Sequence, residues 1–205
     1  MLFNTETSKE CLQFIVDTKT PRLPNDIVQF AFLIEPEKAK IIASNTSWLV
    51  VSFNNTHITC NIAKELSKNK YWETLIFQYG CTFEEGAFLY LENSNTKNLF
   101  LSGSKLNNNN IIEIMSCSKW ENLDFSFCNL TDESLPIILK EKSWKIISLS
   151  GNQFSQNNID KLNELHDLYQ SYVFNERISY EEKKEKIKVI YTRGYFLDHR
   201  SLVPM

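Results

Sequence analysis

Residues 120–139 read WENLDFSFCNLTDESLPIIL and residues 144–162 read WKIISLSGNQFSQNNIDKL, and each stretch begins with a tryptophan. The chain contains four tryptophans, and all of them fall on one register with a spacing of 24 residues: Trp48, Trp72, Trp120 and Trp144. Thr96 occupies the remaining place in that register. A fixed period of this length is typical of proteins built from repeated supersecondary units.

Apolar residues recur at fixed places after each tryptophan site, which we count as position 1. Position 4 holds Val51, Leu75, Leu99, Leu123 and Ile147. Position 6 holds Phe53, Phe77, Leu101, Phe125 and Leu149. Positions 11, 16 and 19 are also apolar except at Thr82, so the pattern predicts five units without an insertion. Apolar sites two residues apart share one face of a strand, and sites three or four apart share one face of a helix.

Each unit is therefore predicted to be a strand, a turn and a helix. Such a unit cannot bury its apolar face alone, so the units must stack side by side. Stacking places the strands in a parallel sheet that advances about 4.8 Å per unit. The sequence predicts an α/β fold in the form of a curved, right-handed solenoid.

The pattern resembles that of leucine-rich repeats, L-x-x-L-x-L-x-x-N/C-x-L, in which the strands line a horseshoe. The resemblance covers residues 48–167 as five repeats. It implies that the Asn or Cys at position 9 serves backbone groups in the turn, and this position holds Thr56, Gly80, Ser104, Cys128 and Asn152. Gly80 departs most from the pattern, so the first repeats are expected to have looser turns. The tryptophans are expected to pack in the core with their indole N–H groups bonded to turn carbonyls.

Residues 1–47 are predicted to form a helical N-terminal cap. The run from Thr7 to Glu10 reads as a capping box that begins the first helix. The segment 24–47 resembles a capping unit, with Gln29 at the strand core site. Ala39 and Ile42 are predicted at its helix core sites.

Residues 168–205 are predicted to form a helical C-terminal cap and a tail. One helix is expected over 157–172, and the sequence Ser-Tyr-Glu-Glu at 179–182 opens a second that ends near Thr192. The ends of a solenoid need covers with a polar outer side, and these helices would supply one.

The composition limits the classes of partner. The chain is 42% hydrophobic and 23% charged, which is ordinary for a folded domain. A net charge of -3 gives no basic surface for nucleic acid or for an anionic membrane. No secretory signal and no membrane span are read from the sequence. The five cysteines form no C-x-x-C pair, so a reducing, cytoplasmic compartment is expected.

The candidate binding surface lies on the sheet face away from the helices. Strand side chains alternate, so positions 3, 5 and 7 point to this concave face and position 8 lies at its rim. An apolar cluster with small and polar neighbours is predicted there as a site for a protein partner. We expect it to consist of Thr74, Ile76, Gln78, Tyr79, Phe100, Ser102, Asp124 and Phe127. Two alternatives stay open: a terminal segment folds over the cluster, or the exposed aromatic residues have no role.

Enzyme activity, a cofactor and a metal site are not expected. No Walker loop, nucleophile elbow, H-E-x-x-H or G-x-G-x-x-G motif occurs. The best catalytic candidate is positional: His57 and Cys81 both stand at position 10, so stacking would bring them about 5 Å apart. A solvated rim is the ordinary explanation of such a pair. Three histidines without ligand spacing argue against a metal.

The resemblance implies a monomeric recognition module without enzyme activity. Its lysine- and asparagine-rich composition is similar to that of effector proteins that intracellular bacteria deliver into host cells, and the tail RSLVPM is similar to signals of specialised secretion. Residues 23–48, which begin Leu-Pro-Asn-Asp-Ile, also resemble an F-box, which implies a substrate adaptor of a cullin-type ubiquitin ligase. A self-assembling scaffold, with Ile76 and Phe100 covered by a second copy, is a third possibility.

Overall fold

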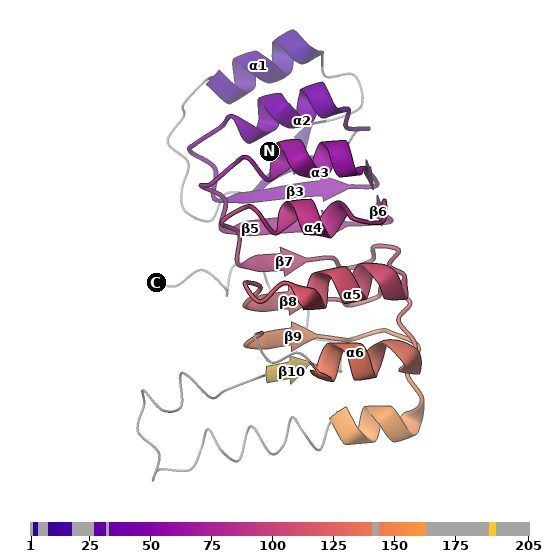
Figure 1. Cartoon of the computed structure of the whole chain (residues 1–205). Helices are drawn as coiled ribbons and strands as arrows, with labels where there is room; N and C mark the ends of the chain where they lie inside the picture. The colour runs from indigo at the N-terminus through magenta and orange to yellow at the C-terminus, as the bar shows by residue number, and fades with distance from the viewer. Residues whose placement is uncertain are drawn as a thin grey trace.

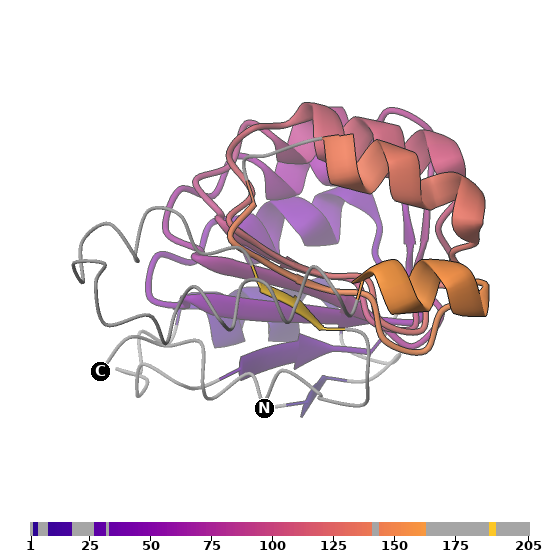
Figure 2. The same cartoon turned by 90° about the horizontal axis from the view of Figure 1, so that it is seen from below.

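The computed structural model describes residues 2–3, 8–17, 27–31, 33–140, 144–162 and 189–191. These residues form an α/β fold around one parallel sheet with the strand order β1-β2-β3-β5-β7-β8-β9-β10, and the predicted class is confirmed. Figure 1 shows the strands stacked one above the next, with helices α1 to α6 in a column beside them. In the view from below, these helices lie on one face of the sheet (Figure 2).

The strands of the main sheet are β1 (Leu2–Phe3), β2 (Ile27–Phe30), β3 (Val50–Asn54), β5 (Thr74–Gln78), β7 (Asn98–Phe100), β8 (Asn122–Asp124), β9 (Ile146–Ser148) and β10 (Val189–Tyr191). A second, two-stranded sheet contains β4 (His57–Ile58) and β6 (Thr82–Phe83). The helices are α1 (Lys9–Asp17), α2 (Pro36–Ala43), α3 (Cys60–Leu66), α4 (Ala87–Leu91), α5 (Asn108–Ser116) and α6 (Leu135–Lys140), with a short 3₁₀ helix η1 (Asp132–Ser134) before α6.

The strand pairs from β3 to β9 follow the spacing seen in the sequence. The five residues of position 4 form one continuous row of neighbours, Val51, Leu75, Leu99, Leu123 and Ile147. All five are buried. The row beside it contains stacked aromatic rings, with centroids 5.6 Å apart for Phe30 and Phe53 and 5.4 Å apart for Phe53 and Phe77. These columns place the core between the sheet and the helices.

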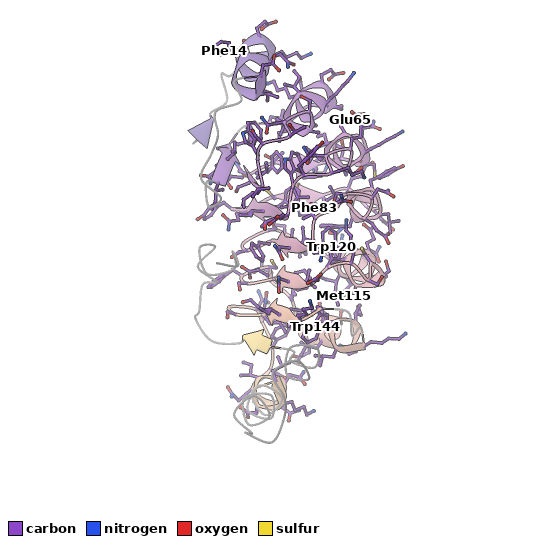
Figure 3. All side chains as sticks on the ribbon, turned by 90° about the vertical axis from the view of Figure 1, so that its left-hand side faces the viewer. Phe14, Glu65, Phe83, Met115, Trp120 and Trp144 are labelled. Atoms are coloured by element: carbon purple, nitrogen blue, oxygen red, sulfur yellow. The ribbon has the colours of Figure 1, made fainter. Side chains whose placement is uncertain are left out.

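The tryptophans lie in this core, as predicted. Figure 3 shows the labelled Trp120 and Trp144 between the strands and the helices. The indole N–H groups of Trp72, Trp120 and Trp144 do not make the expected hydrogen bonds to turn carbonyls. Trp144 Nε1 donates to the carbonyl of Ile138, inside α6, at 3.3 Å. The Nε1 groups of Trp72 and Trp120 are buried and meet no acceptor within the described part of the chain.

The prediction of units without an insertion is wrong in the second unit. Ile58 pairs with Phe83, so Phe83 takes the buried place expected for Thr82. The same one-residue shift continues into α4, where Leu91 is buried and Tyr90, predicted as core, is exposed. The register is restored before β7, because Leu99 again pairs with Leu75. The extra residue is accommodated at Gly80, whose φ of 87° suits a residue without a side chain.

The N-terminal region combines helices with strands, so its prediction as a helical cap is incomplete. Strand β2 extends the sheet, with Val28 beside Val51 and Phe30 beside Phe53, an offset of 23 residues. Phe30 is therefore buried at the core site predicted for Gln29, because the link from strand to helix is one residue shorter here. Ile27–Phe30 is a strand, at the place where the F-box resemblance implies the start of a helix. The helix core residues Ala39 and Ile42 are buried, as expected.

The C-terminal region is described in two pieces. Residues 156–162 are helical, which agrees with the start of the helix expected over 157–172. Val189–Tyr191 forms β10 beside β9, where a helix ending near Thr192 was expected. Valine, isoleucine and tyrosine favour strands, and the exposed edge of a sheet favours pairing. The rest of the predicted cap, including the tail RSLVPM, lies outside the described residues, as does Thr7 of the predicted capping box.

Candidate functional site

The centre of the predicted binding surface is buried. Ile76 and Phe100 are direct neighbours on β5 and β7, as the pattern predicts, but each is only 1% exposed. They form a small apolar cluster with Val50, flanked by Ile27 and Leu49. The expectation that these two side chains face solvent is therefore wrong. The alternation of the strands gives the correct face of the sheet, but it does not report whether that face is covered.

The polar members of the strand surface are buried as well. Asp124, beside Phe100, accepts a hydrogen bond at Oδ1 from the Ser126 backbone N–H at 2.8 Å. The hydroxyls of Ser126 and Ser148 lie 2.7 Å apart. Thr74 accepts a bond from the Asn98 side-chain amide at 2.9 Å. The hydrogen bonds of these polar groups are therefore made to other residues of the same surface. The alternative, cover by a terminal segment, concerns residues outside the described part of the chain.

The rim of the surface is exposed. Tyr79 is 69% exposed and Phe127 is 49% exposed, while Gln78 and Ser102 beside them are half-buried. Of the predicted partner-binding residues, the structure thus separates a buried strand group from an exposed rim group. We define the rim as the residues of position 8, Asn55, Tyr79, Gly103, Phe127 and Gly151.

Every rim residue has a positive φ. The values are 49° for Asn55, 52° for Tyr79, 72° for Gly103, 57° for Phe127 and 69° for Gly151. Glycine and asparagine adopt this left-handed conformation readily, whereas a residue with a large side chain is strained by about 1–2 kcal/mol. Hydrogen bonds between neighbouring units hold the backbone here, for example from Gly103 N–H to Ser126 O and from Phe127 N–H to Ser150 O, each 2.8 Å long. The same turn therefore occurs at all five rim residues. At two of them, Tyr79 and Phe127, it imposes a positive φ on a residue type that disfavours it.

The ring of Phe127 lies over Gly151. A Cβ atom at Gly151 would be 2.3 Å from the Phe127 ring, so the glycine makes room for the aromatic side chain. At Gly103 the nearest atoms to such a Cβ belong to the Tyr79 backbone, at 3.6 Å and 3.9 Å. A methyl group at Gly103 would therefore be in ordinary van der Waals contact with the Tyr79 backbone.

A ladder of side chains lies directly beneath the rim. Asn152 donates to the Phe125 carbonyl at 2.8 Å, and its Oδ1 accepts from the backbone N–H groups of Cys128 and Leu130. Cys128 lies 3.0 Å from the Leu101 carbonyl, which its thiol can reach as donor. Such bonds are what the resemblance implies for position 9. They tie each unit to the one before it and hold the rim backbone in place.

The shifted unit fills this ladder with a neighbour of the predicted residue. Cys81, not Gly80, is buried there, with its thiol 3.3 Å from the Phe53 carbonyl. The catalytic pairing of Cys81 with His57 is consequently wrong: His57 Nδ1 lies 2.8 Å from the hydroxyl of Thr82, its partner in the small sheet. Burial raises the pKa of the Cys81 thiol, which disfavours the thiolate that nucleophilic catalysis needs.

Three lysine side chains lie in an open depression at the edge opposite the rim. The depression is lined by Ser94, Asn95, Thr96, Lys97, Ser118, Lys119, Glu121 and Lys145. Lys119 donates to the Leu91, Glu92 and Ser94 carbonyls at 2.7–2.8 Å, which caps the C-terminus of α4. Burial lowers the pKa of Lys119 to about 8. Glu121 bridges Lys97 and Lys145. The sequence pattern did not reveal this helix cap, because the contact joins residues 28 positions apart.

Among the residues that the structure describes, no group of three or more histidine, cysteine, aspartate or glutamate side chains is arranged to hold a metal ion. None of the helices described is long and apolar enough to span a bilayer.

No family model matches the chain, and no curated protein matches it.

Proposed function

We propose that the chain is a leucine-rich-repeat protein without enzyme activity and that it binds a protein partner through its exposed rim. The solenoid assignment is supported by strand neighbours 24 residues apart and by helices on one face of the sheet. It is also supported by the side-chain ladder at position 9.

One observation carries the binding role: Tyr79 and Phe127 are large, exposed and held in a left-handed backbone conformation. Asparagine and glycine fill the same place in the other units at lower strain. The Tyr79 side chain is mostly in water, so packing offsets little of its strain. Strained, exposed aromatic residues of this kind are typical of recognition sites, where tyrosine and other aromatic side chains dominate the binding energy.

The partner class follows from the sequence resemblance. An effector of an intracellular bacterium acts on a host protein, so we propose that the rim engages a protein of a host cell. The F-box alternative is not carried further, since Ile27–Phe30 is a strand of the main sheet.

Affinity capture from a host-type lysate tests this function. The native chain would be compared with a Tyr79→Asn, Phe127→Asn double variant, in which both rim residues become the residue found at Asn55. Tyr71→Ser is the matched control, because Tyr71 is 55% exposed and lies away from the rim. We expect one partner to be captured by the native chain and by the control and lost by the double variant. Equal capture by all three proteins would contradict rim binding.

The captured partner would then be purified and titrated against each protein. Because asparagine relieves backbone strain, the double variant should unfold at the same denaturant concentration as the native chain or at a higher one. A double variant that unfolds earlier would show that the rim aromatic residues are structural.

A further inference from the structure

The strand centre of the sheet is buried on the face away from the helices. Val50, Ile76 and Phe100 form an apolar cluster there and are only 8%, 1% and 1% exposed. We propose that residues 192–205, which follow β10, lie across this face as an intramolecular cover, and that their release opens a second binding surface. The inference goes beyond binding through the rim, because it concerns the strand centre and the regulation of access to it.

The burial of this face requires a cover from the same chain. Helices α1 to α6 lie on the other face of the sheet (Figure 2), so they do not shield the cluster from water. Ser52 and Ser148, at the two ends of the same row of strand neighbours, are 2% and 0% exposed. A sheet with one face open to solvent normally exposes such polar residues. The cover therefore extends over the strands from β3 to β9.

The segment 192–205 begins where it can cross this face. Tyr191, the last residue of β10, pairs with Ser148 at the edge of the sheet. Three strand spacings, about 14 Å, separate β10 from Phe100 on β7, and two more lead to β3. An extended chain advances about 3.3 Å per residue, so Phe196 can reach Phe100. The whole segment spans up to about 46 Å, which exceeds the ~24 Å from β10 to β3.

The internal links of the chain fit this role less well. Residues 18–26 join α1 to β2, and a path from β2 to β7 and back takes about 29 Å of the ~30 Å that this link can span. No length would remain to pass around the sheet from the helix side. Residues 163–188 contain the charged run EEKKEK at 181–186, which is costly to bury on an apolar face.

The composition of the C-terminal segment matches the face. The segment reads TRGYFLDHRSLVPM and contains two apolar groups, Tyr195–Leu197 and Leu202–Val203. An aromatic ring placed on Phe100 gains from ring–ring contact as well as from burial. Counted at the offset that pairs β10 with β9, Gly194 corresponds to Gly151, so the segment has a glycine where the other units turn at the rim.

A cover of this kind regulates access to the strand centre. Because the segment belongs to the same chain, it competes with a partner at an effective concentration in the millimolar range, on the order expected for short flexible links. A partner that binds the strand centre must therefore displace residues 192–205. Their release exposes Ile76 and Phe100 side by side, the pair that the sequence pattern predicts as a binding surface.

Hydroxyl-radical footprinting of full-length variants tests this inference. In a Phe196→Asp, Leu202→Asp double variant the segment loses apolar contacts, so we expect the labelling of Phe100 to rise about tenfold over the native chain. Phe77, on the core face of the same sheet and 0% exposed, should stay unlabelled, which separates release of the segment from unfolding. Tyr71→Asp is the matched control, because it places Asp at an exposed aromatic site, and Phe100 should stay protected in it.

Two further measurements identify the cover. A synthetic peptide of residues 192–205, added to the double variant at millimolar concentration, should restore the protection of Phe100, whereas a scrambled peptide should not. In the otherwise native chain, Phe196→benzoylphenylalanine should cross-link on irradiation to the tryptic peptide that contains Phe100. This cross-link should form within one molecule, at a yield that does not depend on protein concentration.

Three results would overturn the proposal: unchanged protection of Phe100 in the double variant, no restoration by the peptide, or cross-links from position 196 that avoid the strand centre or join two molecules. If Phe77 is labelled together with Phe100, the double variant has unfolded and the cross-link alone decides. Binding through the rim is judged separately, by capture of the partner, because Tyr79 and Phe127 are exposed while the strand centre is covered.

Discussion

Phe100 and Phe127 are both predicted by the 24-residue pattern to lie on the concave surface, yet Phe100 is buried and Phe127 is half in water. Phe100 lies in strand β7 beside Ile76, where the backbone is extended and the side chain has apolar neighbours. Phe127 follows strand β8, where the chain turns with a φ of 57°. Burial of the side chains at the strand centre therefore contributes stability, whereas the positive φ of the aromatic residues at the rim costs stability.

The largest expected effect belongs to the strand centre. Phe100→Ala removes a buried ring, so we expect a loss of about 3–5 kcal/mol in the free energy of unfolding. Urea denaturation of the variant and the native chain measures this difference. A loss below about 1 kcal/mol, as expected for an exposed side chain, would contradict the stabilising role of the buried Phe100 ring.

Glycine substitutions at the rim come next. Gly151→Ala strains the left-handed turn and drives a methyl group into the Phe127 ring, so we expect a loss of about 2–4 kcal/mol. Gly103→Ala is the matched control, because its φ is similar but the added methyl group makes only ordinary van der Waals contact, 3.6 Å and 3.9 Å from two Tyr79 backbone atoms. It should cost only about 1–2 kcal/mol. Equal losses by denaturation would show that the Phe127 ring does not cover Gly151.

A small gain is expected at the rim. Tyr79→Asn replaces a strained, exposed tyrosine by a residue that adopts positive φ more readily, so stability should rise by up to about 1 kcal/mol. Thermal and urea unfolding would measure the gain. A clear loss would mean that the Tyr79 side chain supports the fold and is not held ready for a partner.

The smallest effect concerns the thiols beneath the rim. Burial raises the pKa values of Cys81 and Cys128, and the nearby charge of Asp124 adds to the effect at Cys128. Both thiols therefore stay protonated at pH 8 in the folded state. Iodoacetamide should leave them unmodified there and should modify them after unfolding in urea, with mass spectrometry as the readout. Rapid modification of Cys81 in the folded protein would reopen its role as a nucleophile.

The sequence predicted the parts of the fold that depend on periodicity. The prediction that the residues at position 4 form one buried row is correct, because a buried column tolerates only apolar residues. The pairing of the strands follows from that row. The one-residue shifts at Gly80 and before Ala39 were missed, because an extra or missing residue in a turn leaves the apolar columns nearly unchanged. The polar Thr82 beside the apolar Phe83 is the signal in the sequence for the first shift.

The candidate site was predicted only in part. Alternation along a strand correctly put Ile76 and Phe100 on one face, but burial depends on contacts that lie far apart in the sequence. The exposed rim could have been recognised more sharply, because asparagine and glycine at positions 55, 103 and 151 indicate a left-handed turn at that place. Tyrosine and phenylalanine at 79 and 127 are then the residues that the turn itself does not favour.

Hydroxyl-radical footprinting of the native chain, read by mass spectrometry at single residues, tests the division between strand centre and rim most directly. Phe14, which is 69% exposed, serves as the internal standard for an accessible phenylalanine. We predict strong labelling of Tyr79 and Phe127, at rates comparable with that of Phe14, and almost none of Phe100. Labelling of Phe100 as fast as Phe14, or protection of Tyr79 and Phe127 in the isolated protein, would contradict the account.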